Sequence, residues 1–306
     1  MNLTSENQIH LYTFKNRLHE LIELFNKDKF PNKVIFSGPK GIGKCTLAYH
    51  LINYVLSVDE DFPYDYKNNI INPENKSFKL IQNKSCPNFN LIDINEKKKS
   101  IDISQIRNLI LDLNKSSFNS KPRIKLINNI EFLNKNSINA LLKVLEEPSV
   151  NTYFILINNN KKVLATLKSR CLDFKISLTH EESINISNKL IDTNVLDLIS
   201  EEILDYYFTP GKIYNLIKFS RENSFDLKNL SLKNFLSYII DKNLYKKDNP
   251  IKYMIYDFFE LYLIKKSSAK DLDFVSYFLN QIRNLKKFNL DEDTLLLDFK
   301  YKQLNG

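Results

Sequence analysis

The stretch Lys33-Val-Ile-Phe-Ser-Gly-Pro-Lys-Gly-Ile-Gly-Lys-Cys45 decides the fold. Its first five residues predict a short buried strand, and the residues from Lys44 to about Ser57 carry apolar side chains at helical spacing. Glycine is scarce, with five in 306 residues, yet three of the five fall within six positions between the strand and the helix. This order, with the spacing G-x-x-x-x-G-K, predicts a loop whose backbone N–H groups and lysine bind phosphate. The residues predicted to bind a nucleotide are Gly38, Gly41, Gly43, Lys44, Cys45 and Thr46.

Two features that a phosphate-loop hydrolase needs are missing. The position after the loop lysine should hold a hydroxyl for Mg²⁺ but holds Cys45, whose soft thiol suits that metal poorly. The strand Ile124–Ile127 should be followed by carboxylates, but Asn128 and Asn129 follow it, and an amide cannot act as a carboxylate base. Glu131 is a candidate substitute, although a solvated glutamate at the start of a helix is the preferred interpretation. We therefore expect a degenerate hydrolytic centre and no intrinsic catalysis.

Apolar runs of strand length alternate with helical patterns in the first part of the chain. Besides the strand before the glycine loop, the predicted strands are Asn90–Ile94, Ile124–Ile127, Thr152–Ile157 and Leu172–Ile176, with helices at Ser104–Asn114 and Asn134–Glu147. This alternation predicts an α/β fold in which helices cover a parallel sheet. The polar stretch 57–90, rich in Asn and Lys, is expected to be an insertion or a long surface loop.

Helical patterns replace the strand signals after about Ser177. A first helical segment contains the breaker Thr209-Pro210-Gly211, and a second contains Tyr253–Ile264, which is apolar on most sides, as in a helix buried in a bundle or interface. We therefore expect three domains, an α/β domain at 1–177 and all-α domains at 178–225 and 226–306.

Composition narrows the class of protein further. Apolar residues at 43% and charged residues at 26% are near globular averages, which excludes a disordered or collagen-like chain. Three widely separated cysteines, Cys45, Cys86 and Cys171, can form neither a disulfide framework nor a four-cysteine zinc site. No signal-peptide pattern and no stretch of about 18 apolar residues is present, so we expect a cytoplasmic protein without membrane contact.

Three further motifs are specific when they occur together. They are Asn139-Ala-Leu-Leu-Lys-Val-Leu-Glu-Glu-Pro148, Thr152-Tyr-Phe-Ile-Leu-Ile-Asn158 and Leu167-Lys-Ser-Arg-Cys171. Their combination resembles the clamp-loader branch of the AAA+ ATPases, and within it the delta-prime family of the bacterial DNA polymerase III clamp loader. The resemblance is nearly full length, and the stretch 57–90 is its least secure part.

The resemblance implies both a fold and a role in replication. It implies a RecA-like AAA+ domain, a small helical lid and a C-terminal helical collar that joins subunits into a ring. The implied partners are the gamma/tau motor subunits and the delta subunit, with the sliding clamp and primed DNA reached through the complex. Arg170 corresponds to an arginine that, in this family, reaches in trans into the ATPase site of a neighbouring subunit. The alternative is that Arg170 makes only a local salt bridge. Asn158 occupies a sensor-1 position and Lys212 a sensor-2 position in the lid, where a structural role is equally open.

Some expectations remain open at this point. The preferred interpretation is a non-hydrolysing subunit of the clamp loader. The alternatives are an active gamma-like motor and a nucleotide-binding AAA+ protein outside replication. Many relatives carry four zinc-binding cysteines before the second strand, whereas only Cys86 lies in that interval, so we expect no zinc and no other required cofactor, with ATP or ADP bound without hydrolysis as an option. Cys171 is expected to pack as a small hydrophobe.

The net charge of +8 is unevenly distributed. Basic and acidic residues number 26 and 17 in 1–177, 4 and 8 in 178–225, and 14 and 11 in 226–306. We therefore expect salt-sensitive DNA association to depend mainly on residues 1–177, with Lys97-Lys-Lys99 and the helix near Ser104 as candidate contacts, although a lysine run is more often a solvated loop.

Overall fold

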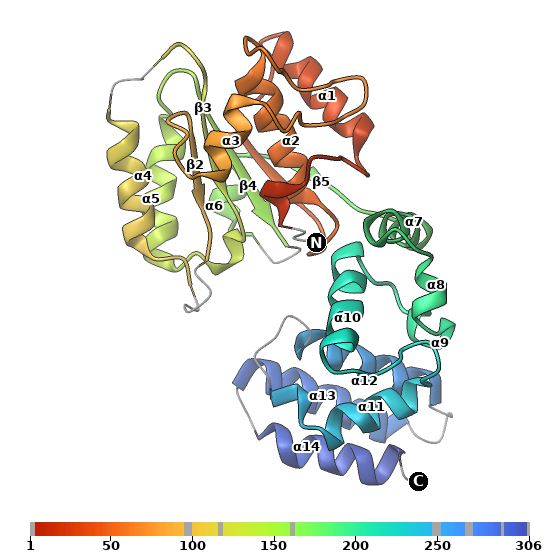
Figure 1. The fold of residues 1–306 in the computed structure, drawn as a ribbon. Helices are drawn as coiled ribbons and strands as arrows, with labels where there is room; N and C mark the ends of the chain where they lie inside the picture. Colours follow the sequence, from red (N-terminus) through yellow and green to blue (C-terminus); the bar gives the residue numbers. More distant parts are fainter. Residues whose placement is uncertain are drawn as a thin grey trace. The chain divides into compact units, whose positions relative to one another are not determined.

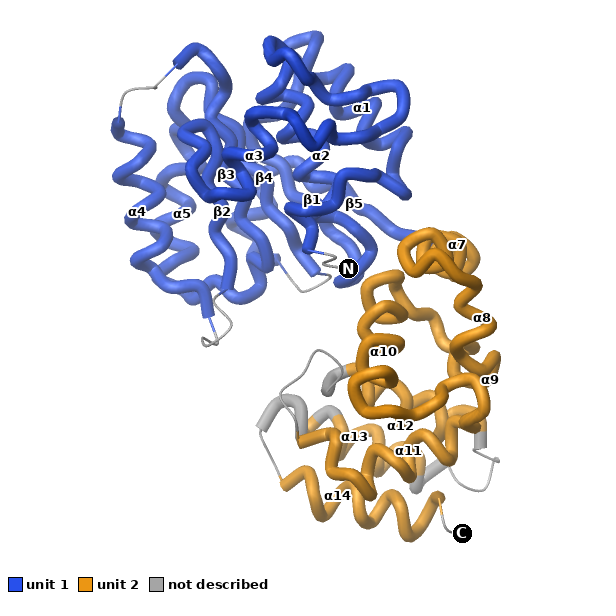
Figure 2. Tube along the Cα trace, viewed as in Figure 1, with its two compact units in different colours: residues 1–178 blue, residues 179–306 orange. Residues whose placement is uncertain are grey.

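The computed structural model divides into two compact units, residues 1–178 and residues 179–306, which are described separately (Figure 2). The residues that the structure describes are 4–94, 100–115, 119–159, 163–246, 252–266, 272–288 and 291–304. Lys97–Lys99, a candidate DNA contact, lie outside them.

The first unit is built on a five-stranded parallel sheet in the order β2-β3-β4-β1-β5 (Figure 1). Its strands are β1 (Lys33–Ser37), β2 (Phe89–Ile92), β3 (Arg123–Ile127), β4 (Thr152–Asn158) and β5 (Leu172–Lys175). The central strands β1, β3 and β4 read as nearly continuous apolar runs because helices cover both of their faces. The predicted parallel α/β sheet is therefore confirmed.

Helices lie on both faces of this sheet (Figure 1). They are α1 (Lys15–Asn26), α2 (Lys44–Ser57) and α3 (Lys76–Gln82) on one face, and α4 (Ile103–Leu113), α5 (Lys135–Glu146) and α6 (Ala165–Lys168) on the other. Alternate strand residues such as Ile35, Phe154 and Leu156 form one core with the apolar stripes of α4, α5 and α6. Two short 3₁₀ helices, η1 (Ser5–Asn7) and η2 (Ile130–Phe132), complete the unit.

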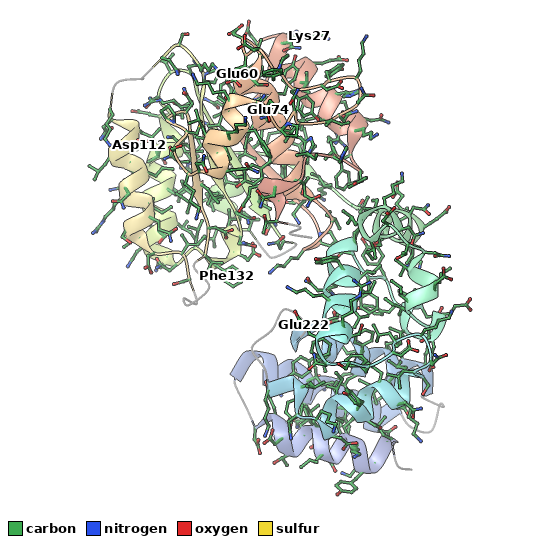
Figure 3. The ribbon with its side chains drawn as sticks, in the orientation of Figure 1. Lys27, Glu60, Glu74, Asp112, Phe132 and Glu222 are labelled. Atoms are coloured by element: carbon green, nitrogen blue, oxygen red, sulfur yellow. The ribbon has the colours of Figure 1, made fainter. Side chains whose placement is uncertain are left out.

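The polar stretch between α2 and β2 is more ordered than a surface loop. It contains α3, whose first turn is capped by the Asn75 side chain accepting from the Phe78 backbone N–H. Glu60, labelled in Figure 3, is 8% exposed and accepts hydrogen bonds from the Ser77 hydroxyl at 2.5 Å and from the Lys121 ammonium at 3.0 Å. The expectation of a long surface loop is therefore wrong, because polar anchors and buried apolar side chains such as Ile71 and Phe78 hold the segment.

The second unit is entirely helical over its described residues. Its helices are α7 (His180–Ile191), α8 (Val195–Leu198), α9 (Glu201–Leu204), α10 (Pro210–Glu222), α11 (Leu232–Asp241), η3 (Leu244–Lys246), α12 (Lys252–Lys266), α13 (Leu272–Phe288), α14 (Glu292–Phe299) and η4 (Lys300–Leu304). The helix breaker predicted at Thr209-Pro210-Gly211 lies at the start of α10, where the Thr209 hydroxyl caps the helix and Pro210 occupies its first turn. The apolar helix α12 is buried along most of its length, as its sequence predicts.

One hydrophobic core runs through the second unit from Val195 to Leu304. It joins residues of the expected lid and of the expected collar, since Phe208 packs against Phe258 and Phe225 against Phe235. The division of this part at 225/226 therefore stays a prediction. No helix among the described residues of either unit is long and apolar enough to cross a membrane.

Candidate phosphate-loop and arginine sites

The glycine loop lies where β1 ends, at the edge of the sheet formed by the carboxyl ends of the strands, called the carboxyl edge below. Gly41 and Gly43 have φ angles of 89° and 98°, which favour glycine because it lacks a Cβ. At Gly38 a Cβ would lie 2.0 Å from the backbone oxygen of Ile176, just after β5. The three glycines therefore let the loop turn tightly against the neighbouring strand, as a phosphate cradle requires.

Lys44 places its ammonium inside this loop. The ammonium donates to the backbone oxygens of Gly38 at 2.8 Å and Pro39 at 2.7 Å, and to the Asn159 side-chain oxygen at 3.0 Å. Burial lowers the pKa of Lys44 to about 8, and the nearby Glu131 carboxylate partly opposes that change. The positive charge and the glycine backbone fit a phosphate group.

Cys45 and Thr46 begin helix α2 directly after the loop lysine. Burial raises the pKa of the Cys45 thiol to about 12, and the Ser5 side chain, from η1, hydrogen-bonds to it. A neutral thiol is a poor ligand for Mg²⁺, which prefers hard oxygen donors. Thr46 is half-buried on the same turn. The position directly after the loop lysine therefore lacks the hard oxygen donor that a magnesium ion would need there.

Asn128 and Asn129 follow β3, where a hydrolase carries its acidic residues. The Asn128 amide donates to one oxygen of Asp93 at 2.8 Å, and the Asn129 amide donates to the other at 2.7 Å. Asp93 follows β2, which pairs with β3, so its side chain lies next to the two asparagines. Each of its carboxylate oxygens accepts a hydrogen bond from one of their amide groups. The two asparagines are thus structural partners of a carboxylate from the next strand.

Asn159 connects this amide pair to the loop lysine. Its side-chain amide donates to the Asn129 oxygen at 2.7 Å and to the Glu131 carboxylate at 2.8 Å, while its oxygen accepts from Lys44. Glu131 is therefore half-buried and bound, and the interpretation of a solvated glutamate is wrong. We call Lys44, Asn159, Glu131, Asn129, Asn128 and Asp93 the amide network.

Asn158 ends strand β4 and points elsewhere. Its side-chain amide approaches the Ser37 hydroxyl at 3.4 Å, and its backbone oxygen accepts from the Gly38 N–H at 3.2 Å. Asn158 therefore secures the start of the glycine loop to β4. The side chain that contacts the loop lysine belongs to the next residue, Asn159.

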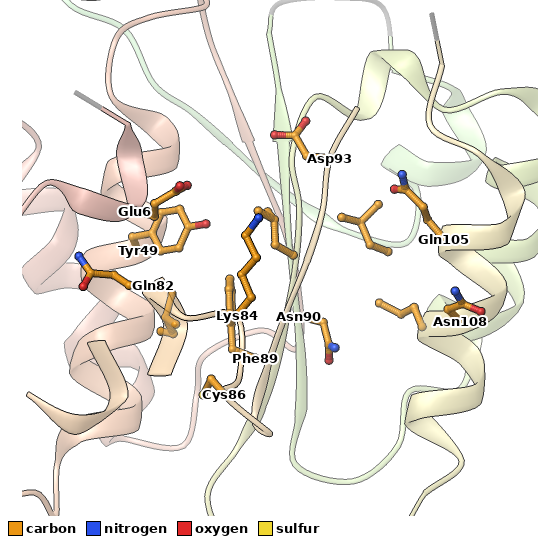
Figure 4. A pocket seen from close by; sticks show the side chains of 14 residues that line it. Glu6, Tyr49, Gln82, Lys84, Cys86, Phe89, Asn90, Asp93, Gln105 and Asn108 are labelled. Atoms are coloured by element: carbon orange, nitrogen blue, oxygen red, sulfur yellow. The ribbon is translucent and has the colours of Figure 1, made fainter. Parts of the chain in front are cut away.

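A cavity of about 560 Å³ lies over the edge strand β2 (Figure 4). Asp93, Tyr49, Lys84, Gln105 and Asn108 are among its lining residues. Within the described part of the chain, its lining includes no residue of the glycine loop. The cavity is thus distinct from the phosphate cradle and meets the amide network only at Asp93.

Arg170 lies at the opposite edge of the sheet, formed by the amino ends of the strands and called the amino edge below. It precedes β5, whose first residue, Leu172, pairs with Val34 near the start of β1. Its guanidinium donates to the Glu146 carboxylate at 2.6 Å and to the Thr166 backbone oxygen at 2.9 Å. The local salt bridge considered from the sequence is therefore present.

Lys212 belongs to the second unit, on α10. Its ammonium donates to the Asp257 carboxylate on α12 at 2.7 Å and lies 5.9 Å from the centre of the Phe208 ring. These contacts give Lys212 a structural role within its own unit. Its role as a sensor stays a prediction.

The cysteines are all free thiols. Cys171 is partly buried against the core that includes residues of α5 and α6, and burial raises the pKa of its thiol to about 11, which agrees with the expected hydrophobic role. In the ranges described above, no three His, Cys, Asp or Glu side chains are grouped as a metal site would need. The expectation of no zinc stays a prediction.

Two side chains of the amide network, Asp93 and Asn159, were missed in the sequence because of strand boundaries. The predicted strand Asn90–Ile94 places Asp93 inside the strand, whereas β2 ends at Ile92 and leaves Asp93 as the first residue beyond it. The predicted strand Thr152–Ile157 is one residue short, because β4 ends at Asn158, the strand-end position that the resemblance gives it, and leaves Asn159 as the first residue beyond it. In parallel sheets the residues after neighbouring strands lie close together, and that rule finds both once the ends are known.

Comparisons with known proteins agree with this geometry. A family described as "DNA polymerase III, delta subunit" matches residues 14–180. The DNA polymerase III subunit delta' of Buchnera aphidicola (subsp. Schizaphis graminum) is 28% identical over 237 residues, covering 74% of this chain and 66% of the relative, just under two thirds of its length. The subunit gamma of the same organism is 31% identical over 162 residues, covering 52% and 42%.

A solved structure shares the fold. The chain resembles a DNA polymerase III gamma subunit-related protein from Thermotoga maritima with a TM-score of 0.51 and 18% identity, over 92% of this chain and 96% of that one. At this level of identity the likeness concerns the fold alone, and it agrees with the predicted combination of an AAA+ sheet domain and a helical region.

Proposed function

This chain belongs to the DNA polymerase III delta-prime family, and from that premise we propose that it is a non-hydrolysing subunit of the clamp loader that supplies Arg170 to a neighbouring ATPase site. Its partners in this proposal are the gamma/tau motor subunits and the delta subunit, and through the complex the sliding clamp and primed DNA. The proposed location is the cytoplasm.

The observation that carries the proposal is the amide network at the carboxyl edge. A hydrolase needs an oxygen ligand for Mg²⁺ after the loop lysine and a carboxylate after the next strand. Here a neutral thiol occupies the first position at Cys45, and amides bound to Asp93 occupy the second at Asn128 and Asn129. A neutral thiol and two amides can neither neutralise the charge of Mg²⁺ nor accept a proton from water.

The separation of Arg170 from the glycine loop supports a role in trans. Because all five strands are parallel, the loop after β1 and the arginine before β5 lie at opposite edges. Four residue steps along β1 correspond to about 13 Å. Arg170 is thus placed away from the phosphate cradle of its own chain, which supports action on a nucleotide bound by another subunit.

The glycine loop itself retains the features that bind phosphate. Gly41 and Gly43 keep the left-handed turns, and Lys44 keeps its charge in the loop. A nucleotide bound there would have its phosphates held by the loop N–H groups and the Lys44 ammonium. In this proposal such binding stabilises the subunit, and turnover takes place at the neighbouring motor.

Two measurements test the proposal. The purified chain should show no ATP turnover above that of its Lys44→Ala variant, and turnover that Lys44→Ala abolishes would favour a gamma-like motor, a function that the gamma relative also suggests. In the reconstituted loader, Arg170→Ala should leave assembly intact and lower clamp- and DNA-stimulated turnover. At the single site served by the arginine, fingers of this kind contribute about 10³–10⁵ in rate.

A further inference from the structure

The guanidinium of Arg170 has three hydrogen-bond acceptors close to it. One terminal nitrogen, Nη2, donates to Glu146 at 2.6 Å, and the other, Nη1, donates to the Thr166 backbone oxygen at 2.9 Å and approaches the Ser169 hydroxyl at 3.4 Å. The Arg170 side chain is 32% exposed and the Glu146 side chain 53%. Glu146 is the one charged group among these acceptors.

The fold fixes both acceptors that bond strongly. Glu146 is the last residue of α5, and Thr166 lies in α6, which ends at Lys168. The carboxyl ends of helices carry partial negative charge, which favours a cation placed there. The guanidinium therefore lies where two helix ends attract it.

A residue of β1 secures the end of α5. The Lys33 ammonium donates to the Leu145 backbone oxygen at 3.0 Å, one residue before Glu146. Lys33 begins the strand that leads into the glycine loop. The end of α5, from which the Glu146 side chain projects, is thus tied by this hydrogen bond to the sheet.

We propose that Glu146 is a positioning residue for Arg170, holding the guanidinium oriented for the nucleotide of the neighbouring subunit; this inference rests on the proposed function. An arginine has five N–H donors, and the described partners engage three of them. Donors remain for an incoming phosphate while Glu146 stays bound. A pair this exposed adds little to stability, so its main effect is to restrict a long, flexible side chain.

The experiment uses the reconstituted loader and measures kcat and KM for ATP under clamp and DNA stimulation. Glu146→Ala should lower kcat about two- to fivefold with KM unchanged, the range expected from losing one exposed ion pair that orients the arginine. Glu146→Gln keeps an acceptor and should lose less. Glu147→Ala is the matched control, because Glu147 is the adjacent exposed carboxylate, and it should leave kcat unchanged.

A double variant separates positioning from other roles. In an Arg170→Ala background, Glu146→Ala should have no further effect on kcat. The inference is overturned if Glu146→Ala leaves kcat at the wild-type level or raises it, or if it lowers kcat equally without the arginine. If Arg170→Ala itself leaves kcat unchanged, the proposed function fails as well. If Arg170→Ala lowers kcat but Glu146→Ala does not, only the role of Glu146 is overturned.

Discussion

His50, on α2 behind the glycine loop, is a neutral base held inside the first unit. It is fully buried, its Nδ1 lies 2.9 Å from the Tyr64 hydroxyl, and its Nε2 lies 3.1 Å from the Gln8 backbone oxygen. A carbonyl oxygen only accepts, so Nε2 donates to Gln8 and Nδ1 accepts from Tyr64. Burial lowers the pKa of His50 to about 4. Acid should therefore destabilise the first unit through this residue.

The size and sign follow from linkage. An unfolded histidine has a pKa near 6.5, so above that pH neither state binds the proton and His50 makes stability independent of pH. Between pH 6.5 and 4 the unfolded chain binds a proton that the folded chain does not, and the free energy of unfolding falls by up to about 1.36 kcal/mol per pH unit. The full loss is about 3 kcal/mol, of which about 2 kcal/mol is reached between pH 7.5 and 5.

Hydrogen exchange of α2 amides, measured by mass spectrometry across this pH range, reports the first unit separately from the second. A His50→Gln variant cannot titrate, so its stability deficit against the wild type should shrink by about 2 kcal/mol between pH 7.5 and 5. His180→Gln, at an exposed position, is the control and should follow the wild type at every pH. If the stability of the wild type and that of His50→Gln change in parallel with pH, His50 is not the group that makes the first unit sensitive to acid.

Three other substitutions give direct tests of the first unit. Gly38→Ala forces a Cβ to within 2.0 Å of the Ile176 oxygen and should destabilise the unit by about 3 kcal/mol in urea unfolding. Glu60→Gln removes the charge from a carboxylate that is 8% exposed and should cost about 1–3 kcal/mol by the same measurement; an unchanged midpoint would show that the segment after α2 is not anchored there. Asn128→Asp places a second carboxylate against Asp93 and should lower the urea midpoint without creating magnesium-dependent ATP turnover; turnover above background would contradict the assignment of a degenerate centre.

The fold of the first unit could be predicted from the sequence because its signals are strong and local. The central strands are mostly apolar, three of the chain's five glycines lie in the loop, and α2 begins and ends where its periodicity does. The segment after α2 could not, because its order depends on polar contacts such as that of Glu60 with Lys121, which are 61 residues apart. Hydrophobic periodicity carries no information about such contacts.

The candidate site was predictable in its residue types but not in its connections. The loss of the hydroxyl and of both carboxylates is visible in Cys45, Asn128 and Asn129. The partners of these residues depend on the ends of β2 and β4, because shifts of two residues and one residue there decide that Asp93 and Asn159 join the network. Strand ends are set by sheet pairing with other strands, so the local sequence determines them poorly.

The amide network and Arg170 lie at different edges of the sheet, so the chain could lose ATP hydrolysis at its own loop and keep the arginine that acts on a neighbour. The amide network gathers after the carboxyl ends of the strands, whereas Arg170, just before β5, and Glu146, at the end of α5, lie at the amino edge. Substitutions that remove a metal ligand at the carboxyl edge leave the arginine, its helix-end acceptors and its Lys33 anchor unchanged. Conversely, neutralising Arg170 alters no contact of Lys44. In the proposed assignment the chain is therefore free to give up turnover at its own loop and still act on its neighbour, and the two kinetic tests above should respond independently.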